Sequence, residues 1–579
     1  MGPITEAMVD INAAIQEVNQ IEGLSFQIIE PEGPYIAMYS GEYRGYGMLK
    51  IGFKASFPYT VPAMFISPVP KMRLHIDSEG KICLTDESSL LLDVSRPAQL
   101  IIECLRLADR VLNLVPDDPE YQVELKKEFL SYWGFQEHGI SIWSIFPISN
   151  CHSVQEVSLF QFEKSYILAS SLSEANSFLC DYRGLAPVDE LKGASQYAWV
   201  MRLKDRAAIL SPFENHDWSD IVRYIKNNTD LETRQKFWDL ASKPVKKTIV
   251  WLIFVVPASD GAEGDIVFGV SVAIKNAHKM PIKASRSKAV LQVNVVRYDY
   301  DFLLSRCGAS PSLKDKRVLL LGCGSVGGFL ANNLCQMGIT QLDILDKDTF
   351  SADNVYRHFM GFEAVKQKAT SYKSDLLRNI LTEKYVYSDI DSLNYIDRTV
   401  ETVILKNPDR LCQYDLIISA LGEPTLNLAI NDLLVTHQIR VPFIVCFNEP
   451  YGIGGHVITT NISNESCLRC FYTDPACGAL CSFRGSLVGA NQAFKKSLSG
   501  CSGIFVPYST LDSQQTAIYA ARKAVEALTR KLTHNDCYTW RGDASLLISQ
   551  GFSVSKYFLS SKEVKHFSNP SCPICQGRK

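Results

Sequence analysis

The chain has 579 residues, too many for a single hydrophobic core, and this length predicts about three or four domains. Its net charge of −3, from 59 basic and 62 acidic residues, argues against a nucleic-acid-binding protein. Residues 1–10 do not resemble a secretory signal. The strongest apolar run, residues 248–257, is about half the ~20 residues that cross a bilayer, so it predicts a buried strand. We therefore expect a cytoplasmic protein with no membrane partner, in which most of the 17 cysteines are reduced.

The sequence divides into three segments. Residues 1–133 run from a helix-like stretch through strand-like runs to a final helical region, the pattern of a small α+β domain. Residues 134–301 alternate strand-like and loop-like stretches without a chemical motif, which indicates an α/β linker or docking domain. Residues 302–579 alternate short apolar strands with helices. This segment predicts a Rossmann-like, mostly parallel sheet with helices on both faces, and the whole chain is multidomain α/β.

A glycine-rich turn follows the first strand of the third segment. Gly322, Gly324 and Gly327 form the pattern G-x-G-x-x-G between an apolar strand and a helix-like stretch, which is typical of a phosphate-binding turn. Asp346 follows the second strand and suits a ribose hydroxyl. These residues alone leave open whether the ligand is a redox dinucleotide or ATP.

Polar and cationic residues beyond that strand favour ATP. Asn354 and Arg357 are one helical turn apart, and Lys366 and Lys368 follow shortly afterwards. Any one of them alone would be read as a solvated surface residue. As an ordered series they suit a triphosphate and its pyrophosphate leaving group, because negative charge accumulates there in the transition state.

This stretch resembles the ThiF/MoeB-type adenylation domain of ubiquitin-activating enzymes and of their bacterial sulfur-carrier-activating relatives. The resemblance covers residues 301–579 and implies a domain that binds ATP with Mg. It places Asp346 on the ribose. It places Asn354, Arg357 and Lys368 around the triphosphate. The complete set of predicted cofactor-binding residues is Gly322, Gly324, Gly327, Asp346, Asp348, Asn354, Arg357, Lys368 and Glu423.

One position departs from the family pattern. After a strand such as the one that ends near Ala420, the family usually has an aspartate that helps to hold Mg. Gly422 stands at that position here, and the adjacent Glu423 is the expected substitute.

Two C-x-x-C pairs predict a structural zinc site. Cys467 and Cys470 form the first pair, and Cys572 and Cys575 form the second, near the end of the chain. Four thiolates make a closed tetrahedral set with no open position for catalysis. The resembling family has the same arrangement, and the zinc would tie the C-terminal tail to the domain.

An adenylating enzyme that passes its acyl group on needs a thiol nucleophile. Cys501 lies between glycines, shortly before a helix-like stretch that would lower its pKa. The resembling family has its catalytic cysteine on a crossover loop between the same two C-x-x-C pairs. Cys477 and Cys481 are the alternatives.

Residues 57–86 of the first segment resemble the core of ubiquitin-conjugating enzymes, in which a proline-rich link precedes a histidine and the catalytic cysteine. Carried over, Cys83 is the acceptor thiol and His75 a structural residue of its loop. The familiar His-Pro-Asn reads His-Ile-Asp here, so the asparagine that supports the oxyanion is missing at Asp77. Either Asp77 or a backbone amide replaces it, or the transfer chemistry differs. Cys104 is expected in the core.

A conjugating half followed by an activating half resembles the fused transferases of bacterial antiphage operons of the cyclic-oligonucleotide type (CBASS). That resemblance implies that the acyl donor is the C-terminus of a cGAS/DncV-like nucleotidyltransferase, that the acceptor is a target lysine, and that the enzyme is a homodimer. Activation of a bacterial ubiquitin-like protein, activation of a sulfur carrier, and a non-catalytic scaffold are the alternatives. Whether transfer occurs within one chain or across a dimer is open.

Overall fold

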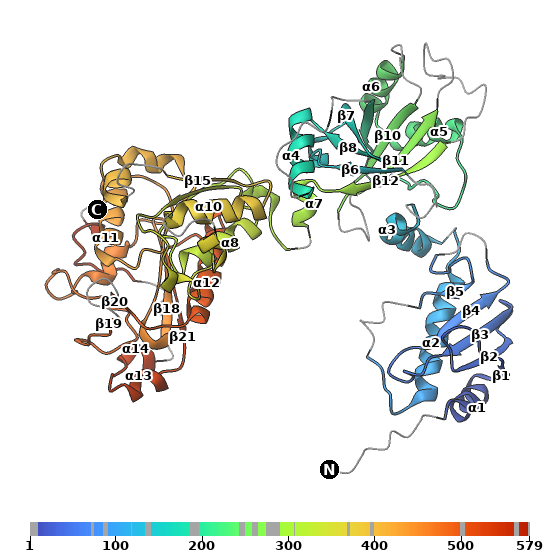
Figure 1. The fold of residues 1–579 in the computed structure, drawn as a ribbon, viewed down its shortest axis with the longest axis horizontal. Coiled ribbons are helices and arrows are strands. Elements are labelled where there is room, and N and C mark those ends of the chain that lie inside the picture. The colour runs from blue at the N-terminus through green and yellow to red at the C-terminus, as the bar shows by residue number, and fades with distance from the viewer. Residues whose placement is uncertain are drawn as a thin grey trace. The chain divides into compact units, whose positions relative to one another are not determined.

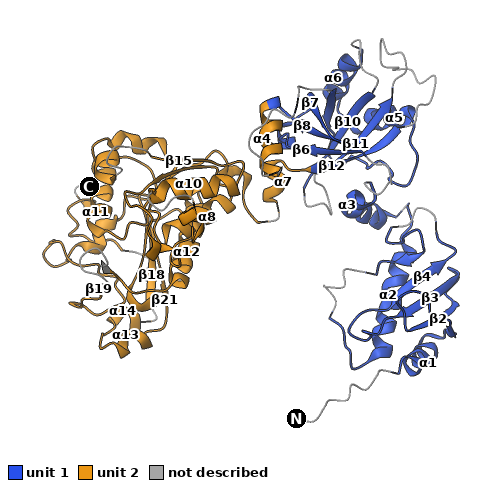
Figure 2. Ribbon diagram, in the orientation of Figure 1, with its two compact units in different colours: residues 1–172, 191–296 blue, residues 173–190, 297–579 orange. Residues whose placement is uncertain are grey.

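The structure is a computed structural model in which the chain forms two compact units (Figures 1 and 2). One unit comprises residues 1–172 and 191–296, and the other comprises residues 173–190 and 297–579. The structure describes residues 10–70, 74–84, 91–116, 118–133, 140–183, 191, 196–205, 207–242, 249–257, 264–273, 290–305, 307–366, 371–393, 399–497, 504–560 and 567–576.

The first unit begins with an antiparallel sheet and two helices that share one core. Helix α1 starts where the Asp10 side chain accepts the Ala13 N–H, and it ends at Gly23, whose φ is +65°. This order of helix, meander and helix is the α+β pattern that the sequence predicts, and Cys104 is buried in the core as expected. The elements are α1 (Ile11–Glu22), β1 (Gln27–Ile29), β2 (Ala37–Glu42), β3 (Met48–Phe53), β4 (Ala63–Ser67), β5 (Lys81–Ile82) and α2 (Pro97–Asn113).

The same unit continues through helix α3 (Pro119–Trp133) into a closed barrel with the strand order β10-β11-β12-β6-β8-β7-β9. A closed barrel has no unpaired strand edges. Its strands are β6 (Ile140–Ser144), β7 (Val154–Phe162), β8 (Ser165–Ala169), β9 (Gln196–Arg202), β10 (Ile249–Val256), β11 (Ile266–Ala273) and β12 (Val290–Arg297). Its helices are α5 (Trp218–Asn228) and α6 (Leu231–Ser242), whereas α4 (Leu172–Arg183) belongs almost entirely to the other unit.

Strand β10 shows why the apolar run 248–257 carries no polar alternation. Trp251, Ile253 and Val255 belong to one hydrophobic cluster of the barrel, whereas Leu252 and Phe254 belong to another. The second cluster also contains residues of α3, α5 and α6. Both faces of the strand are therefore covered, as the sequence predicts for this run.

The second unit is built on a seven-stranded sheet with the order β15-β14-β13-β16-β17-β18-β21. The pairs from β15 to β17 are parallel, and β18 and β21 are antiparallel additions. The strands are β13 (Arg317–Leu321), β14 (Gln341–Leu345), β15 (Asp389–Ser392), β16 (Leu416–Ser419), β17 (Phe443–Asn448), β18 (Gly454–Thr460) and β21 (Asp536–Arg541), with a small pair β19 (Lys496–Ser497) and β20 (Ile504–Phe505).

Separate hydrophobic clusters lie on the two faces of this sheet. One contains residues of α8, α10 and α12, and the other contains residues of α11, so helices cover both faces as the sequence predicts. The helices of the unit are α7 (Tyr300–Leu304), α8 (Gly327–Gln336), α9 (Glu363–Lys366), α10 (Lys373–Lys384), α11 (Pro424–Thr436), α12 (Thr510–Leu528), α13 (Ser545–Ser549) and α14 (Lys556–Leu559).

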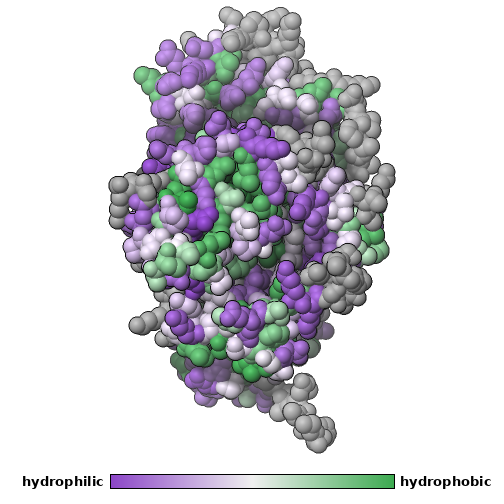
Figure 3. Space-filling view, turned by 90° about the vertical axis from the view of Figure 1, so that its left-hand side faces the viewer, coloured by the Kyte–Doolittle hydropathy of each residue, from purple (hydrophilic) through white to green (hydrophobic). Residues whose placement is uncertain are grey.

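Hydrophobic side chains on the surface are interspersed with hydrophilic ones on the face shown in Figure 3. Tyr356 and Leu559, 96% and 76% exposed, are examples of single exposed apolar residues. Among the described residues, no helix has both the length and the apolar content needed to span a bilayer.

The buried end of α3 provides a test of the barrel core. Phe129 is fully buried and packs edge-on against Phe268 at a centroid distance of 4.8 Å. We predict that Phe129→Ala lowers the free energy of unfolding of this unit by about 3–5 kcal/mol, because it leaves a cavity in a closed core. Urea denaturation followed by tryptophan fluorescence measures the change. Leu130→Ala, at an exposed position of the same helix, should stay within about 0.5 kcal/mol, and equal losses for both variants would contradict the prediction.

Candidate functional site

The predicted glycine turn connects β13 to α8. Gly322 has a φ of +84°, a left-handed conformation that residues with a Cβ disfavour. A Cβ on Gly327 would lie 2.0 Å from the Gly322 carbonyl oxygen, far inside contact distance. Nothing would lie within 4 Å of a Cβ on Gly324. The strand and helix therefore meet only because these residues are glycines, and the backbone at Gly324 is open to a ligand.

Asp346 is fixed against this turn at the end of β14. Its Oδ2 accepts the Cys323 N–H at 2.8 Å, and its Oδ1 accepts the Asp348 N–H at 2.9 Å. Burial, and then the charge of Asp346, raise the pKa of the Cys323 thiol well above its ordinary value, so this cysteine stays neutral. The charged group that this turn holds in a fixed position is therefore the Asp346 carboxylate.

A cavity of about 130 Å³ opens beside the turn, and we call it the glycine-loop cavity. Its lining residues lie at the C-terminal ends of β13, β14 and β16. The strand order reverses at this point of the sheet, and parallel α/β sheets bind their ligands at such a point. Its charged lining residues are Asp346, Lys347, Asp348, Lys373, Glu401 and Glu423.

Lys373 brings a largely buried ammonium group to this cavity. It is the first residue of α10, and its side chain is 10% exposed. Its Nζ lies 3.0 Å from the Asp348 carboxylate, and its N–H donates to the Asp348 carbonyl oxygen at 2.9 Å. Lysine is rarely buried without a partner. The sequence alone did not single out Lys373, because Lys366 and Lys368 precede it in the same stretch and only the packing of α10 distinguishes them.

Asn354 and Arg357 are not part of the described lining of this cavity. Asn354 is buried, and its side chain accepts the Ser351 N–H in the cap of a short 3-10 helix. Arg357 is half-exposed and lies 3.4 Å from the Asp353 carboxylate. Burial lowers the pKa of the neighbouring His358 to about 3, so that imidazole is neutral at physiological pH. The roles of Asn354 and Arg357 toward a triphosphate remain predictions.

The backbone conformation favours glycine at position 422, where the family usually has an aspartate. Gly422 is exposed with a φ of +68°, and the exposed Glu423 follows it at the N-cap position of α11. Glu423 lines the glycine-loop cavity together with Glu401 and Asp348. Carboxylate oxygens are the ligands that Mg²⁺ prefers, and one or two of them can hold the ion together with nucleotide phosphates. Among the described residues, the carboxylates of this cavity do not form a cluster of three or more ligands as the four cysteines do.

The two C-x-x-C pairs come together as predicted. The Sγ atoms of Cys467, Cys470, Cys572 and Cys575 all lie within 4.8 Å of one another, and all four residues are buried. Cys467 and Cys572 are 3.8 Å apart, and Cys470 and Cys575 are 3.4 Å apart. A tetrahedral zinc with Zn–S bonds of about 2.3 Å places its sulfur ligands roughly 3.8 Å apart, so the cluster fits that ion.

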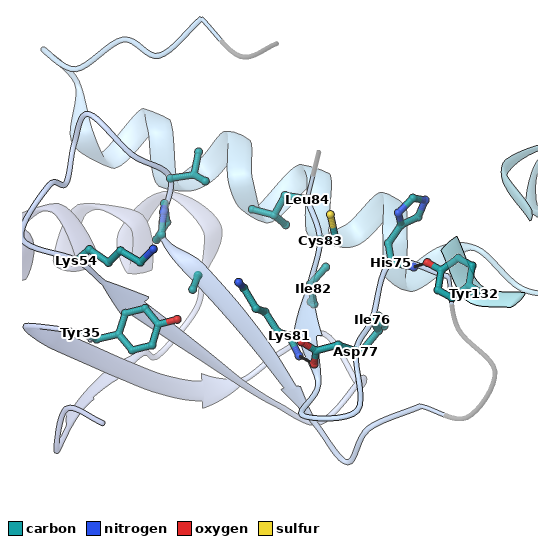
Figure 4. A pocket seen from close by; sticks show the side chains of 13 residues that line it. Tyr35, Lys54, His75, Ile76, Asp77, Lys81, Ile82, Cys83, Leu84 and Tyr132 are labelled. Atoms are coloured by element: carbon teal, nitrogen blue, oxygen red, sulfur yellow. Dashed lines mark hydrogen bonds between the residues drawn. The ribbon is translucent and has the colours of Figure 1, made fainter. Parts of the chain in front are cut away.

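Cys83 lies directly after β5 and is exposed. It borders two cavities, one of about 320 Å³, the thiol cavity, and a second of about 270 Å³. Figure 4 shows Cys83 in the thiol cavity between Lys54 and Tyr35 on one side and His75 and Tyr132 on the other. Cys83 is therefore accessible from solvent.

Asp77, at the position of the family asparagine, uses its side chain in local hydrogen bonds. The Asp77 Oδ1 accepts the N–H groups of Glu79 and Lys81, each at 2.9 Å, and so holds the turn before β5. An ionised carboxylate is an acceptor only. Asp77 therefore cannot donate a hydrogen bond to an oxyanion in that state.

Two predicted residues, Lys368 and Cys501, lie outside the described residues, so their roles remain predictions. Of the alternatives to Cys501, Cys477 is exposed and Cys481 is half-buried. Burial raises the pKa of Cys481, which disfavours its thiolate.

Residues 304–573 match the ThiF family. The sheet, the glycine turn and three of the four clustered cysteines fall within that range, and Cys575 lies two residues beyond it. This part of the chain is therefore a ThiF-family domain.

Over most of its length the chain is similar to proteins named Cap2. It is 29% identical to "ATP-dependent ubiquitin transferase-like protein Cap2" of Vibrio cholerae serotype O1 over 42% of this chain and 41% of the relative. It is 23% identical to the protein of that name from Escherichia coli (strain TW11681) over 89% of each chain. A crystal structure of E. coli MccB with MccA-N7isoASN is 14% identical, covers 47% of this chain and 72% of its own, and has a TM-score of 0.32.

The cysteine cluster leads to a prediction about metal content. Cys575→Ser removes one of four ligands, so bound zinc should fall well below the expected content of about one ion per chain, and the melting temperature of the ThiF-family domain should drop. Elemental analysis after gel filtration and differential scanning fluorimetry measure the two effects. Cys477→Ser, which alters an exposed cysteine outside the cluster, should retain the metal. A wild-type protein purified without zinc would contradict the prediction.

Proposed function

We propose that this chain uses ATP to adenylate the C-terminal carboxyl group of a protein, carries the acyl group on two of its cysteines and conjugates it to an amine. The observation that carries the proposal is the glycine-loop cavity, where a fixed carboxylate and a buried ammonium group meet at the switch point of a ThiF-family domain. The name of the Cap2 relatives, ATP-dependent ubiquitin transferase-like protein, supports it.

Each group in the cavity has a role in the first step. The Asp346 carboxylate accepts hydrogen bonds from the ribose hydroxyls, and the open backbone at Gly324 approaches the phosphates. Lys373 neutralises negative charge on the triphosphate, as do Arg357 and Lys368 if they approach it when ATP binds. Glu423, with Asp348, would hold Mg²⁺, which when bound neutralises phosphate charge.

The first step is the adenylation of the substrate carboxylate. An oxygen of the substrate carboxylate attacks the α-phosphorus of ATP, a new P–O bond forms, and the bond to the leaving pyrophosphate breaks. The product is an acyl adenylate, which a thiolate attacks readily.

Two cysteines are proposed to carry the acyl group. The Cys501 thiolate attacks the acyl adenylate and displaces AMP. The Cys83 thiolate then attacks the resulting thioester, so that a C–S bond to Cys83 forms, the C–S bond to Cys501 breaks and Cys501 leaves as a thiolate. An amine nitrogen of a target lysine finally attacks the thioester carbonyl. A C–N bond forms, the C–S bond to Cys83 breaks, and the amine proton is released as the thiolate departs.

The donor proposed for this reaction is the C-terminus of a cGAS/DncV-like nucleotidyltransferase, in a cytoplasmic CBASS antiphage system. The similarity to Cap2 proteins over 89% of each chain in the E. coli case supports this choice. The relative "Adenylyltransferase and sulfurtransferase UBA4" from Lodderomyces elongisporus is matched over only 35% of this chain. A homodimer of ThiF-family domains completes the proposal.

The first step is tested by ATP–pyrophosphate exchange with a peptide or protein that carries the donor C-terminus. We predict that Lys373→Ala lowers the exchange rate by about 10²-fold or more, because a buried cation facing the triphosphate is lost. Lys531→Ala, which removes an exposed lysine outside the cavity, should leave the rate unchanged. Equal exchange by wild type and Lys373→Ala would remove Lys373 from the proposed mechanism.

The relay is tested by non-reducing gels and mass spectrometry of thioesters. Cys501→Ala should retain pyrophosphate exchange and form no thioester on Cys83, whereas Cys83→Ala should accumulate the acyl group on Cys501, since the second acceptor is missing. Cys307→Ala, at another exposed cysteine, is the control. Loss of the thioester with Cys477→Ala or Cys481→Ala in place of Cys501→Ala would reassign the first thiol.

A further inference from the structure

Helix α3 belongs to two hydrophobic cores at once. Near its N-terminal end, Tyr121 and Leu125 pack with Leu74 and Leu114 beside the Cys83 loop. At its C-terminal end, Phe129 and Trp133 belong to the core of the barrel. The helix is therefore a structural element shared by the conjugating-like domain and the barrel, both of which lie in one compact unit.

Trp133 fixes the C-terminal end of this helix. Its indole N–H donates to the carbonyl oxygens of Gly269 on β11 and Val293 on β12, at 3.1 and 3.2 Å. Its ring stacks on Phe129 and packs edge-on against Phe268. A buried, hydrogen-bonded tryptophan is a rigid anchor.

Tyr132, the preceding residue, reaches the loop of the candidate thiol. Its Oη accepts the His75 N–H at 2.8 Å. Its ring packs against Phe213 with a distance of 5.1 Å between the ring centroids. Tyr132 also lines the thiol cavity with Cys83, and its hydroxyl points toward the His75 backbone in Figure 4. Because Oη is the acceptor in this bond, the phenol O–H is still available as a donor.

His75 links Tyr132 to Cys83 through its backbone. Its φ is +61°, a conformation that costs a non-glycine residue about 1 kcal/mol or more, so its surroundings must hold it. The bond to Tyr132 holds its N–H, and its carbonyl oxygen accepts the Cys83 N–H at 2.7 Å. The Nε2 atom lies 3.9 Å from the Glu124 carboxylate, also on α3.

We propose that Tyr132 is a positioning residue for acyl transfer at Cys83, and that the barrel, through α3, is a working part of the conjugating site. In this role the phenol, anchored through Trp133, holds the strained His75 loop and thereby fixes the backbone of Cys83. The inference rests on the proposed function, because it concerns the discharge of a thioester on Cys83.

The test is a single-turnover discharge of the Cys83 thioester to increasing concentrations of a lysine-like amine, with the full chain loaded by ATP and donor. Tyr132→Phe keeps the ring and removes the hydroxyl. Its maximal discharge rate per loaded chain should fall about tenfold, which corresponds to the loss of one well-formed hydrogen bond. The half-saturating amine concentration and the rate of pyrophosphate exchange should not change, and the melting temperature should stay within about 2 °C.

Two further variants separate positioning from stability. Tyr46→Phe removes a hydroxyl that donates to Asn113 in the same domain, outside the described lining of the two Cys83 cavities, and should discharge at the wild-type rate. Trp133→Phe keeps an aromatic ring in the barrel and should reduce discharge in the same direction as Tyr132→Phe.

The outcomes distinguish the two proposals. If wild-type enzyme forms no thioester on Cys83, the proposed function fails. If wild type loads and discharges normally and Tyr132→Phe matches it, the positioning role of Tyr132 is overturned. If Trp133→Phe lowers only the melting temperature, the barrel is excluded from the conjugating site.

Discussion

The close approach of Gly327 to the Gly322 carbonyl oxygen is the contact on which the ThiF-family domain depends. It allows α8 to begin immediately after β13, and that geometry brings the Cys323 N–H onto the Asp346 carboxylate. Asp348 follows on the same chain segment and pairs with Lys373 at the start of α10. The lack of a side chain at Gly327 thus allows the charged residues that line the glycine-loop cavity to come together.

The candidate thiol at Cys83 depends on a different kind of constraint. No glycine occupies the strained position there, and His75 is held in its left-handed conformation by hydrogen bonds from both sides. One of these partners comes from a helix whose other end is buried in the barrel. The segment without any chemical motif, which forms the barrel, is thereby linked through α3 to the loop that carries the proposed chemistry.

The two sites also differ in what their cysteines can do. Burial keeps Cys323 a neutral thiol beside the glycine turn, and the four cysteines of the cluster are buried at distances that suit zinc. Cys83 is exposed and borders two cavities. The chain therefore contains both buried, clustered cysteines and an exposed cysteine beside a cavity.

Local patterns in the sequence determined much of this protein. The apolar strands, the glycine turn with Asp346 and the paired cysteines follow from periodicity, from φ requirements and from ligand spacing, each of which acts within a few residues. The tertiary structure alone decided that Lys373 lines the cavity beside Lys347, that strands β6 to β12 close into a barrel, and that Tyr132 reaches His75. These depend on contacts between residues distant in sequence, where several lysines or tyrosines look alike until packing selects one.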